Sequence, residues 1–211
     1  MSFLRKPFRY RNENIVFILI GINVLVYLGE IFLTRLNIAF NLSMFPLLVI
    51  SQGRIWQFVT YMFVHDPRSM GHIIFNMLAL FIFGSQVERY MGSREFLLYY
   101  MVTGVLAGVF SFVFYVATGN WIVLLMGASG AIFAVQLAYA ALFPNAIIYI
   151  WGILPLRAPV MVLVFTVISL VSMFTGFGGN VSHLTHLAGF AFGWIYFLVR
   201  FGINPWRAMR K

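Results

Sequence analysis

The sequence predicts an all-α polytopic membrane protein with six transmembrane helices in a single domain. Three observations carry this prediction. Apolar residues make up 62% of the 211 residues and fall into six long runs. Charged residues make up only 9%, whereas an ordinary water-soluble domain carries about 25%, so the chain cannot cover a surface that faces water. Most runs approach the length that a helix needs to cross a bilayer, which is about 20 residues.

The six runs are the expected helices. The first follows a basic start, as in a signal peptide, but it is long and no small-residue cleavage site follows, so we expect it to remain as a helix. The fourth is short and stops before Pro144, and its first amides need water or protein as partners because hydrocarbon offers none. The expected bounds are 15–33, 71–87, 96–117, 129–143, 158–175 and 183–201.

The segment 35–70, between the first two runs, is amphipathic and too interrupted to span a membrane. It carries several aromatic residues, including Trp56 and Tyr61. Aromatic rings gather at the boundary between lipid and water. We therefore expect an external loop that lies partly in the outer leaflet.

Basic residues predict the orientation. Eleven of the 14 lie at the chain ends or in connections on one side of the expected bundle, and three lie on the other side. Since Lys and Arg are retained in the cytoplasm, both termini are expected there, as short basic tails at 1–14 and 202–211 around a membrane domain at 15–201. The net charge of +9 reflects this orientation, so no nucleic-acid partner is expected. The expected location is a bacterial-type inner membrane.

Polar and ionisable residues inside apolar runs indicate function, because burying them in lipid is costly. His72 and Asn76 are four residues apart and share one face of the second helix. Ser129 begins the fourth helix, where unpaired amides and the positive end of the helix favour a developing anion. His186 lies in the first turn of the sixth helix. All four are expected on the external side.

Small residues predict which helix faces meet. His186, Gly189 and Gly193 fall on one stripe of the sixth helix, and the two glycines form a GxxxG pattern that lets another backbone approach closely. Gly130 and the alanines that follow it give the fourth helix a small face as well. Packing of these two faces would bring Ser129 and His186 together within the bilayer.

Such a pair has the chemistry of a serine hydrolase. A serine hydroxyl becomes a nucleophile when a neighbouring base takes its proton, and histidine suits that role near neutral pH. His72, Asn76 and the Ser129 amide could donate to an oxyanion, where one donor is worth about 2.7–4 kcal/mol in a known hydrolase. The apolar cores near the site contain no carboxylate, so we expect a Ser-His dyad whose imidazole packs against the Phe133 ring.

Simpler roles remain open for these residues. Ser129 could be only a helix cap, and His72 and Asn76 could form a structural hydrogen bond. The base could be His183, one turn earlier, in place of His186. A non-catalytic membrane protein, either a transporter or an inactive binder of transmembrane helices, is the alternative class.

The other polar residues of the external side are expected to be less important. His65 lies in a loop beside Asp66, so we expect it to be solvated or interfacial. A metal site on the histidines would lack its usual carboxylate or thiolate ligands, because no carboxylate is near and the chain has no cysteine. Neither a metal nor a cofactor is therefore expected.

Several stretches, taken together and in order, resemble the rhomboid family of intramembrane serine proteases. The three that carry the proposed site are 71-GHIIFN-76, 127-GASG-130 and 186-HLAGFAFG-193. The first external loop agrees through 56-WQFVTYMFVH-65, and the turn after the second helix agrees through 84-GSQVERYMGS-93. The resemblance implies a six-helix rhomboid-like bundle.

The resemblance also implies a role for each matching residue. Ser129 corresponds to the family's nucleophile, His186 to its base, and His72 and Asn76 to the pair on the oxyanion side. The supporting glycines that match are Gly127, Gly130 and Gly189. The family cleaves transmembrane helices of other proteins without a cofactor, so membrane-protein substrates and the lipid bilayer are the implied partners, with no particular oligomeric state predicted.

Two positions depart from the family pattern. Gln57 stands where arginine is usual in the first loop, which puts the family's contacts there in doubt. Phe133 stands where a tyrosine is often found, which keeps a ring but removes a hydroxyl. We further expect substrates to enter sideways near the fifth helix, with the glycine-rich loop 176–182 acting as a pliable lid.

Overall fold

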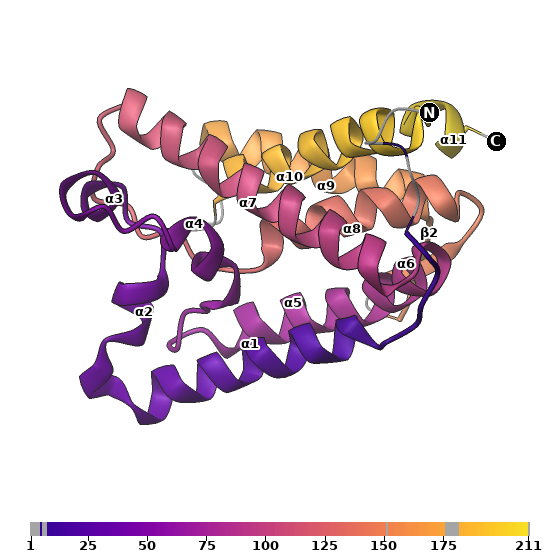
Figure 1. Cartoon of the computed structure of the whole chain (residues 1–211). Helices are drawn as coiled ribbons and strands as arrows, with labels where there is room; N and C mark the ends of the chain where they lie inside the picture. Colours follow the sequence, from indigo (N-terminus) through magenta and orange to yellow (C-terminus); the bar gives the residue numbers. More distant parts are fainter. Residues whose placement is uncertain (1–4, 6–7, 151, 176–181, 211) are drawn as a thin grey trace.

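The computed structural model describes residues 5, 8–150, 152–175 and 182–210 and is a bundle of α-helices (Figure 1). Among these residues, five helical stretches are long and apolar enough to cross a membrane, and a sixth apolar helix is shorter. This confirms the predicted pattern, including the short fourth helix. The helices are α1 (Ile15–Phe32), α5 (Met70–Ala79), α6 (Ser85–Met91), α7 (Ser93–Ala117), α8 (Ser129–Leu142), α9 (Ala158–Thr175), α10 (His183–Tyr196) and α11 (Pro205–Met209).

The second membrane helix is longer than predicted. A π-helical turn, η4 (Leu80–Gly84), joins α5 to α6, so the helix ends at Met91 and not at residue 87. Glu88 lies just after the predicted end of the helix, and its side chain is buried. Its carboxylate accepts hydrogen bonds from the backbone amides of Ile15 and Val16, at 2.7 and 2.9 Å, and so caps the start of α1.

The segment between α1 and α5 consists of short helical pieces at one end of the bundle (Figure 1). Each has at most seven residues, which is far too short to cross a bilayer. The prediction that this segment does not span is therefore confirmed. The pieces are η2 (Thr34–Leu36), α2 (Ile38–Leu42), α3 (Pro46–Gln52), α4 (Gln57–Thr60) and η3 (Tyr61–Phe63).

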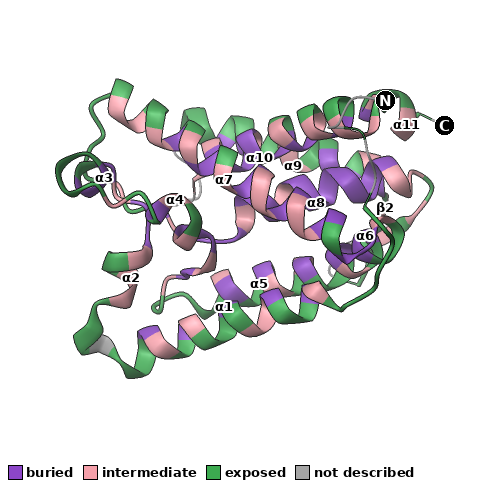
Figure 2. Ribbon diagram, viewed as in Figure 1, coloured by how far each residue is buried: buried purple, intermediate pink, exposed green. Residues whose placement is uncertain are grey.

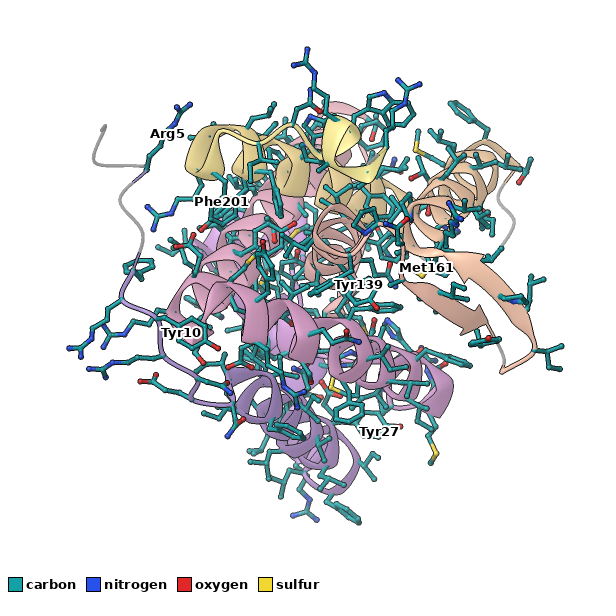
Figure 3. The ribbon with its side chains drawn as sticks, turned by 90° about the vertical axis from the view of Figure 1, so that its right-hand side faces the viewer. Arg5, Tyr10, Tyr27, Tyr139, Met161 and Phe201 are labelled. Atoms are coloured by element: carbon teal, nitrogen blue, oxygen red, sulfur yellow. The ribbon has the colours of Figure 1, made fainter. Side chains whose placement is uncertain are left out.

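A β-hairpin departs from the all-helical prediction. Strands β1 (Ile147–Ile150) and β2 (Leu154–Arg157) pair antiparallel between α8 and α9. Figure 3 views the other end of the bundle, and there the hairpin projects beside the helices. The β-branched run of β1 suits a strand, and Gly152 supplies the left-handed φ of 71° in the turn.

Helix α8 forms the centre of the bundle. It is buried along most of its length between α7 and α10 (Figure 2). Buried hydroxyl groups form hydrogen bonds between these helices. The Tyr99 hydroxyl on α7 donates to the carbonyl of Ala134 at 2.6 Å, and the hydroxyls of Ser111 and Thr185 lie 2.7 Å apart. Helix α7 is thereby hydrogen-bonded to both α8 and α10.

The beginning and the end of the described chain meet at one end of the bundle. The Arg5 guanidinium donates to the carbonyl of Val199 at 3.3 Å, and Arg200 pairs with the buried Glu95 of α7 at 2.7 Å. Arg200 lies in η5 (Phe197–Phe201), a π-helical turn that extends α10. An even number of membrane crossings predicts this arrangement, and the cytoplasmic location of that end stays a prediction.

Candidate active site

Ser129 and His186 are in hydrogen-bond contact. The Oγ of Ser129 lies 2.8 Å from the Nε2 of His186, although the two residues are 57 positions apart in the chain. Ser129 is the first residue of α8, and His186 lies in the first turn of α10. The structure therefore brings together the pair that the small-residue pattern predicted.

Glycines make this contact possible by letting the two backbones approach. A Cβ on Gly189 of α10 would lie only 2.0 Å from the carbonyl oxygen of Gly130 on α8. One turn further along, a Cβ on Gly193 would lie 3.2 Å from Cα of Ala134. The GxxxG face predicted on the sixth helix is the face that packs on the fourth.

Aromatic stacking fixes the plane of the imidazole. The ring of Phe133, one helical turn after Ser129, stacks on His186 with centroids 4.1 Å apart and an interplanar angle of 15°. The ring of Phe190 also packs against that of Phe133, with centroids 5.0 Å apart. Phenylalanine thus supplies the stacking ring at the position where a tyrosine is often found. His186 is buried, with 8% of its surface exposed.

His183 occupies a different position from His186. Its ring stands almost perpendicular to that of His186, at 88°, with centroids 5.8 Å apart. The imidazole in contact with the Ser129 hydroxyl is that of His186. The geometry therefore favours His186 as the base over the alternative left open by the sequence.

His72 and Asn76 face the chain just before Ser129. A Cβ on Gly127 would lie 2.9 Å from Nε2 of His72 and 3.8 Å from Nδ2 of Asn76. Gly127 also has a φ of 118°, a conformation that residues with a side chain rarely adopt. Nitrogen atoms of both side chains of α5 thus lie beside the segment that leads into Ser129.

The segment between α1 and α5 holds that approach to Ser129 in place. Met44 and Leu125 exchange two backbone hydrogen bonds, each of 2.9 Å. The amide of Gly127 donates to the carbonyl of Tyr61 at 2.9 Å, and the Tyr61 hydroxyl donates to the carbonyl of Gly104 on α7 at 2.6 Å. Tyr61 is fully buried. The sequence indicates only an interfacial aromatic residue at this position, whereas the structure shows a link between Gly127 and α7.

Gln57 replaces the arginine of the family pattern with a different set of contacts. It is fully buried. Its Oε1 accepts from the amide of Phe45 at 3.1 Å, and its Nε2 donates to the carbonyl of Asn41 at 3.2 Å. The first loop is therefore organised around an uncharged side chain in this protein.

The prediction that His65 is solvated or interfacial is wrong. Its side chain is fully buried, its Nε2 lies 3.1 Å from Nδ2 of Asn76, and its ring lies 5.0 Å from that of His72. The neighbouring Asp66 and the loop position suggested exposure. The available signal was that His65 ends the same motif stretch that carries Trp56, but only the fold places it against Asn76.

Two further expectations concern the surroundings of the site. Within the described ranges, no group of three His, Asp or Glu side chains is arranged to hold a metal ion. The expected lid at 176–182 falls outside the described residues except for Ser182, whose hydroxyl lies 2.9 Å from that of Tyr115 and 2.6 Å from that of Thr185.

Comparison with known proteins agrees with this architecture. A family model described as Rhomboid domain matches residues 52–203. The chain is 28% identical over 191 residues to the rhomboid protease GlpG of Haemophilus influenzae. This alignment covers 90% of this chain and 93% of GlpG. It is 40% identical over 96 residues to the rhomboid protease GluP of Bacillus subtilis, but there the match spans 44% of this chain and only 17% of GluP. The chain therefore belongs to the rhomboid family of integral membrane proteins.

Proposed function

We propose that this protein is an intramembrane serine endopeptidase that cleaves transmembrane segments of other membrane proteins. The observation that carries the proposal is the 2.8 Å contact between the Ser129 hydroxyl and the His186 imidazole inside an apolar bundle. Relatives that bear the name of rhomboid proteases support the reaction class.

The proposed reaction uses His186 first as a base and then as an acid. As Oγ of Ser129 attacks the carbonyl carbon of the substrate, Nε2 of His186 takes the hydroxyl proton, and the carbonyl electrons move onto oxygen. The tetrahedral intermediate then collapses, the peptide C–N bond breaks, and the leaving amine takes the proton from His186. Water attacks the acyl-enzyme in the same way, which releases the second product and restores Ser129.

The oxyanion is proposed to lie on the α5 side of Ser129. There Nε2 of His72 and Nδ2 of Asn76 face Gly127, and the amide of Ser129 is the third donor. Donors that are fixed before the reaction stabilise the developing charge without reorganising. We propose that the substrate reaches this site from lipid beside α9 and that water comes from the external side.

Substrates with glycine or proline near the cut are expected to react best, because an intact helix hides its carbonyl groups from attack. The protein would act in an inner membrane of the bacterial type with both termini in the cytoplasm, as the basic residues suggest. No cofactor takes part in the proposed reaction.

Labelling with a serine-reactive fluorophosphonate tests the proposal. Wild-type protein should become labelled, Ser129→Ala should not, and His186→Ala should lose most of the label because its hydroxyl is no longer activated. His183→Ala is the matched control, since it removes a neighbouring imidazole that the mechanism does not use, and should retain most of the label.

Cleavage of a membrane-anchored reporter by the same variants completes the test. Label that persists in Ser129→Ala would contradict the proposed nucleophile. Wild-type protein that binds a transmembrane substrate but neither cleaves it nor reacts would instead be a non-catalytic member of the family.

A further inference from the structure

His65 and Asn76 form a hydrogen bond whose direction is fixed by chemistry. The Nε2 of His65 lies 3.1 Å from the amide nitrogen of Asn76, and both groups are buried. An amide nitrogen carries two N–H groups and accepts no hydrogen bond. Asn76 is therefore the donor, and the lone pair on Nε2 of His65 is the acceptor.

This direction sets the tautomer of His65. A neutral imidazole whose Nε2 accepts must carry its proton on Nδ1. The backbone of Phe63 interacts favourably with the protonated ring, although Nδ1 makes no full hydrogen bond among the described residues. Burial, and then the neighbouring His72, lower the pKa of His65 to about 3, so the ring stays neutral near pH 7 and keeps its acceptor.

A buried acidic side chain lies next to the backbone of His65. The carboxyl group of Glu30, on α1, lies beside the backbone amide of His65 and is itself buried. The ring of His65 also packs edge-on against His72, with an interplanar angle of 61°. The buried ring of His65 thus packs against His72 and offers its Nε2 to Asn76 as an acceptor.

The consequence for Asn76 concerns its second N–H. One N–H of the amide is occupied by His65, and the amide nitrogen lies 3.8 Å from the Cβ position of Gly127. Rotation of the amide would break the buried bond to His65, which is costly. The remaining N–H is therefore aimed at the segment that carries Ser129.

We propose that His65 is a positioning residue that aims the Asn76 amide at the oxyanion of the reaction. It acts through Asn76 and does not touch the substrate. This inference rests on the proposed function, because it assigns a purpose to Asn76 only if an oxyanion forms beside Ser129.

A double-mutant cycle between the two positions tests the inference in the full-length protein. His65→Leu removes the acceptor and keeps an apolar side chain, whereas His65→Gln keeps an acceptor oxygen on a side chain of similar reach. We expect His65→Leu to lower kcat on a membrane-anchored reporter about ten-fold or more, less than the loss of a whole oxyanion donor, with KM changed less than about two-fold. His65→Gln should recover most of kcat.

The background with Asn76→Ala separates positioning from general support of the fold. If His65 acts through Asn76, His65→Leu should change kcat less than about two-fold in that background, because the donor that it aims is already gone. An equal loss of kcat in both backgrounds, or a His65→Gln variant as poor as His65→Leu, would overturn the inference. Thermal unfolding of each variant identifies any that fail to fold, and the Gln variant then decides the question.

The cycle also distinguishes this inference from the proposed function. Cleavage that disappears in Ser129→Ala, together with independent effects at His65 and Asn76, would refute the positioning role alone. Cleavage that persists in Ser129→Ala would refute the serine mechanism itself.

Discussion

The imidazole of His186 depends on Phe133 for its orientation. A ring that stacks at 4.1 Å and 15° leaves His186 one plane in which Nε2 faces the Ser129 hydroxyl. Stacked aromatic pairs contribute about 0.5–1.5 kcal/mol beyond their burial. The hydroxyl of a tyrosine is not needed for this contact, so the departure from the family pattern leaves the stacking intact.

Replacing Phe133 tests the stacking directly. Phe133→Leu keeps an apolar side chain but removes the ring, so kcat should fall roughly 2- to 12-fold, which converts the stacking energy at about 1.4 kcal/mol per factor of ten. Phe133→Tyr retains the ring and should remain close to wild type. Steady-state cleavage of a membrane-anchored reporter gives both values, and a Leu variant with unchanged kcat would show that the stack does not orient the base.

At the scale of helices, the close approach of α8 and α10 positions the two residues of the candidate site. Gly189 lies so near Gly130 that an added methyl group has no room, since the obstacle is a backbone carbonyl and not a mobile side chain. Gly21 in α1 has free space around it. Among the described residues, a Cβ there would meet no heavy atom within 4 Å apart from its own helix backbone and chain neighbours. A side chain at Gly189 would therefore disturb the packing of α10 on α8, whereas a side chain at Gly21 would not disturb the bundle.

Alanine at each of these glycines should separate the two cases. Gly189→Ala forces α10 away from α8, and overpacking of this kind costs about 1–3 kcal/mol, so thermal stability should fall and cleavage should drop at least about ten-fold. Gly21→Ala should be neutral or slightly stabilising, because alanine favours a helix. A Gly189→Ala variant with full activity and an unchanged unfolding temperature would contradict the packing described for α8 and α10.

Much of this fold follows from the length of the apolar runs, because a bilayer demands helices of nearly fixed length. The site follows from residue type and spacing, since Ser129, His186, His72 and Asn76 each lie at a helical position that the sequence defines. The environment of His65 does not follow, because it depends on a partner on another element. The strand β1 was also missed, since a short apolar run suits either a helix or a strand.

The whole molecule carries its charge unevenly, with most basic residues at the end where the chain begins and finishes. Arg5 and Arg200 both belong to that end: Arg5 donates to the carbonyl of Val199, and Arg200 pairs with Glu95 of α7. The segment between α1 and α5, which contains α3, lies at the opposite end of the bundle (Figure 1). The proposed orientation therefore predicts that the two ends of the bundle are accessible from opposite sides of the membrane.

Single cysteines read out that orientation, because the chain contains none of its own. A cysteine at the exposed Ser51 in α3 should react with a membrane-impermeant maleimide applied to intact spheroplasts. A cysteine at the exposed Arg207 in α11 should react only after the membrane is permeabilised. The reverse pattern would place the basic end outside and contradict the assignment.

The separation of Ser129 and His186 by 57 positions in the chain also bears on how the molecule is made. A nascent polypeptide that has been inserted as far as α8 already holds the alcohol but not the base that would activate it. If the proposed function holds, proteolytic activity would then arise only when α10 docks against α8, late in biogenesis. Unfinished chains would be harmless to the other proteins emerging from the same translocon.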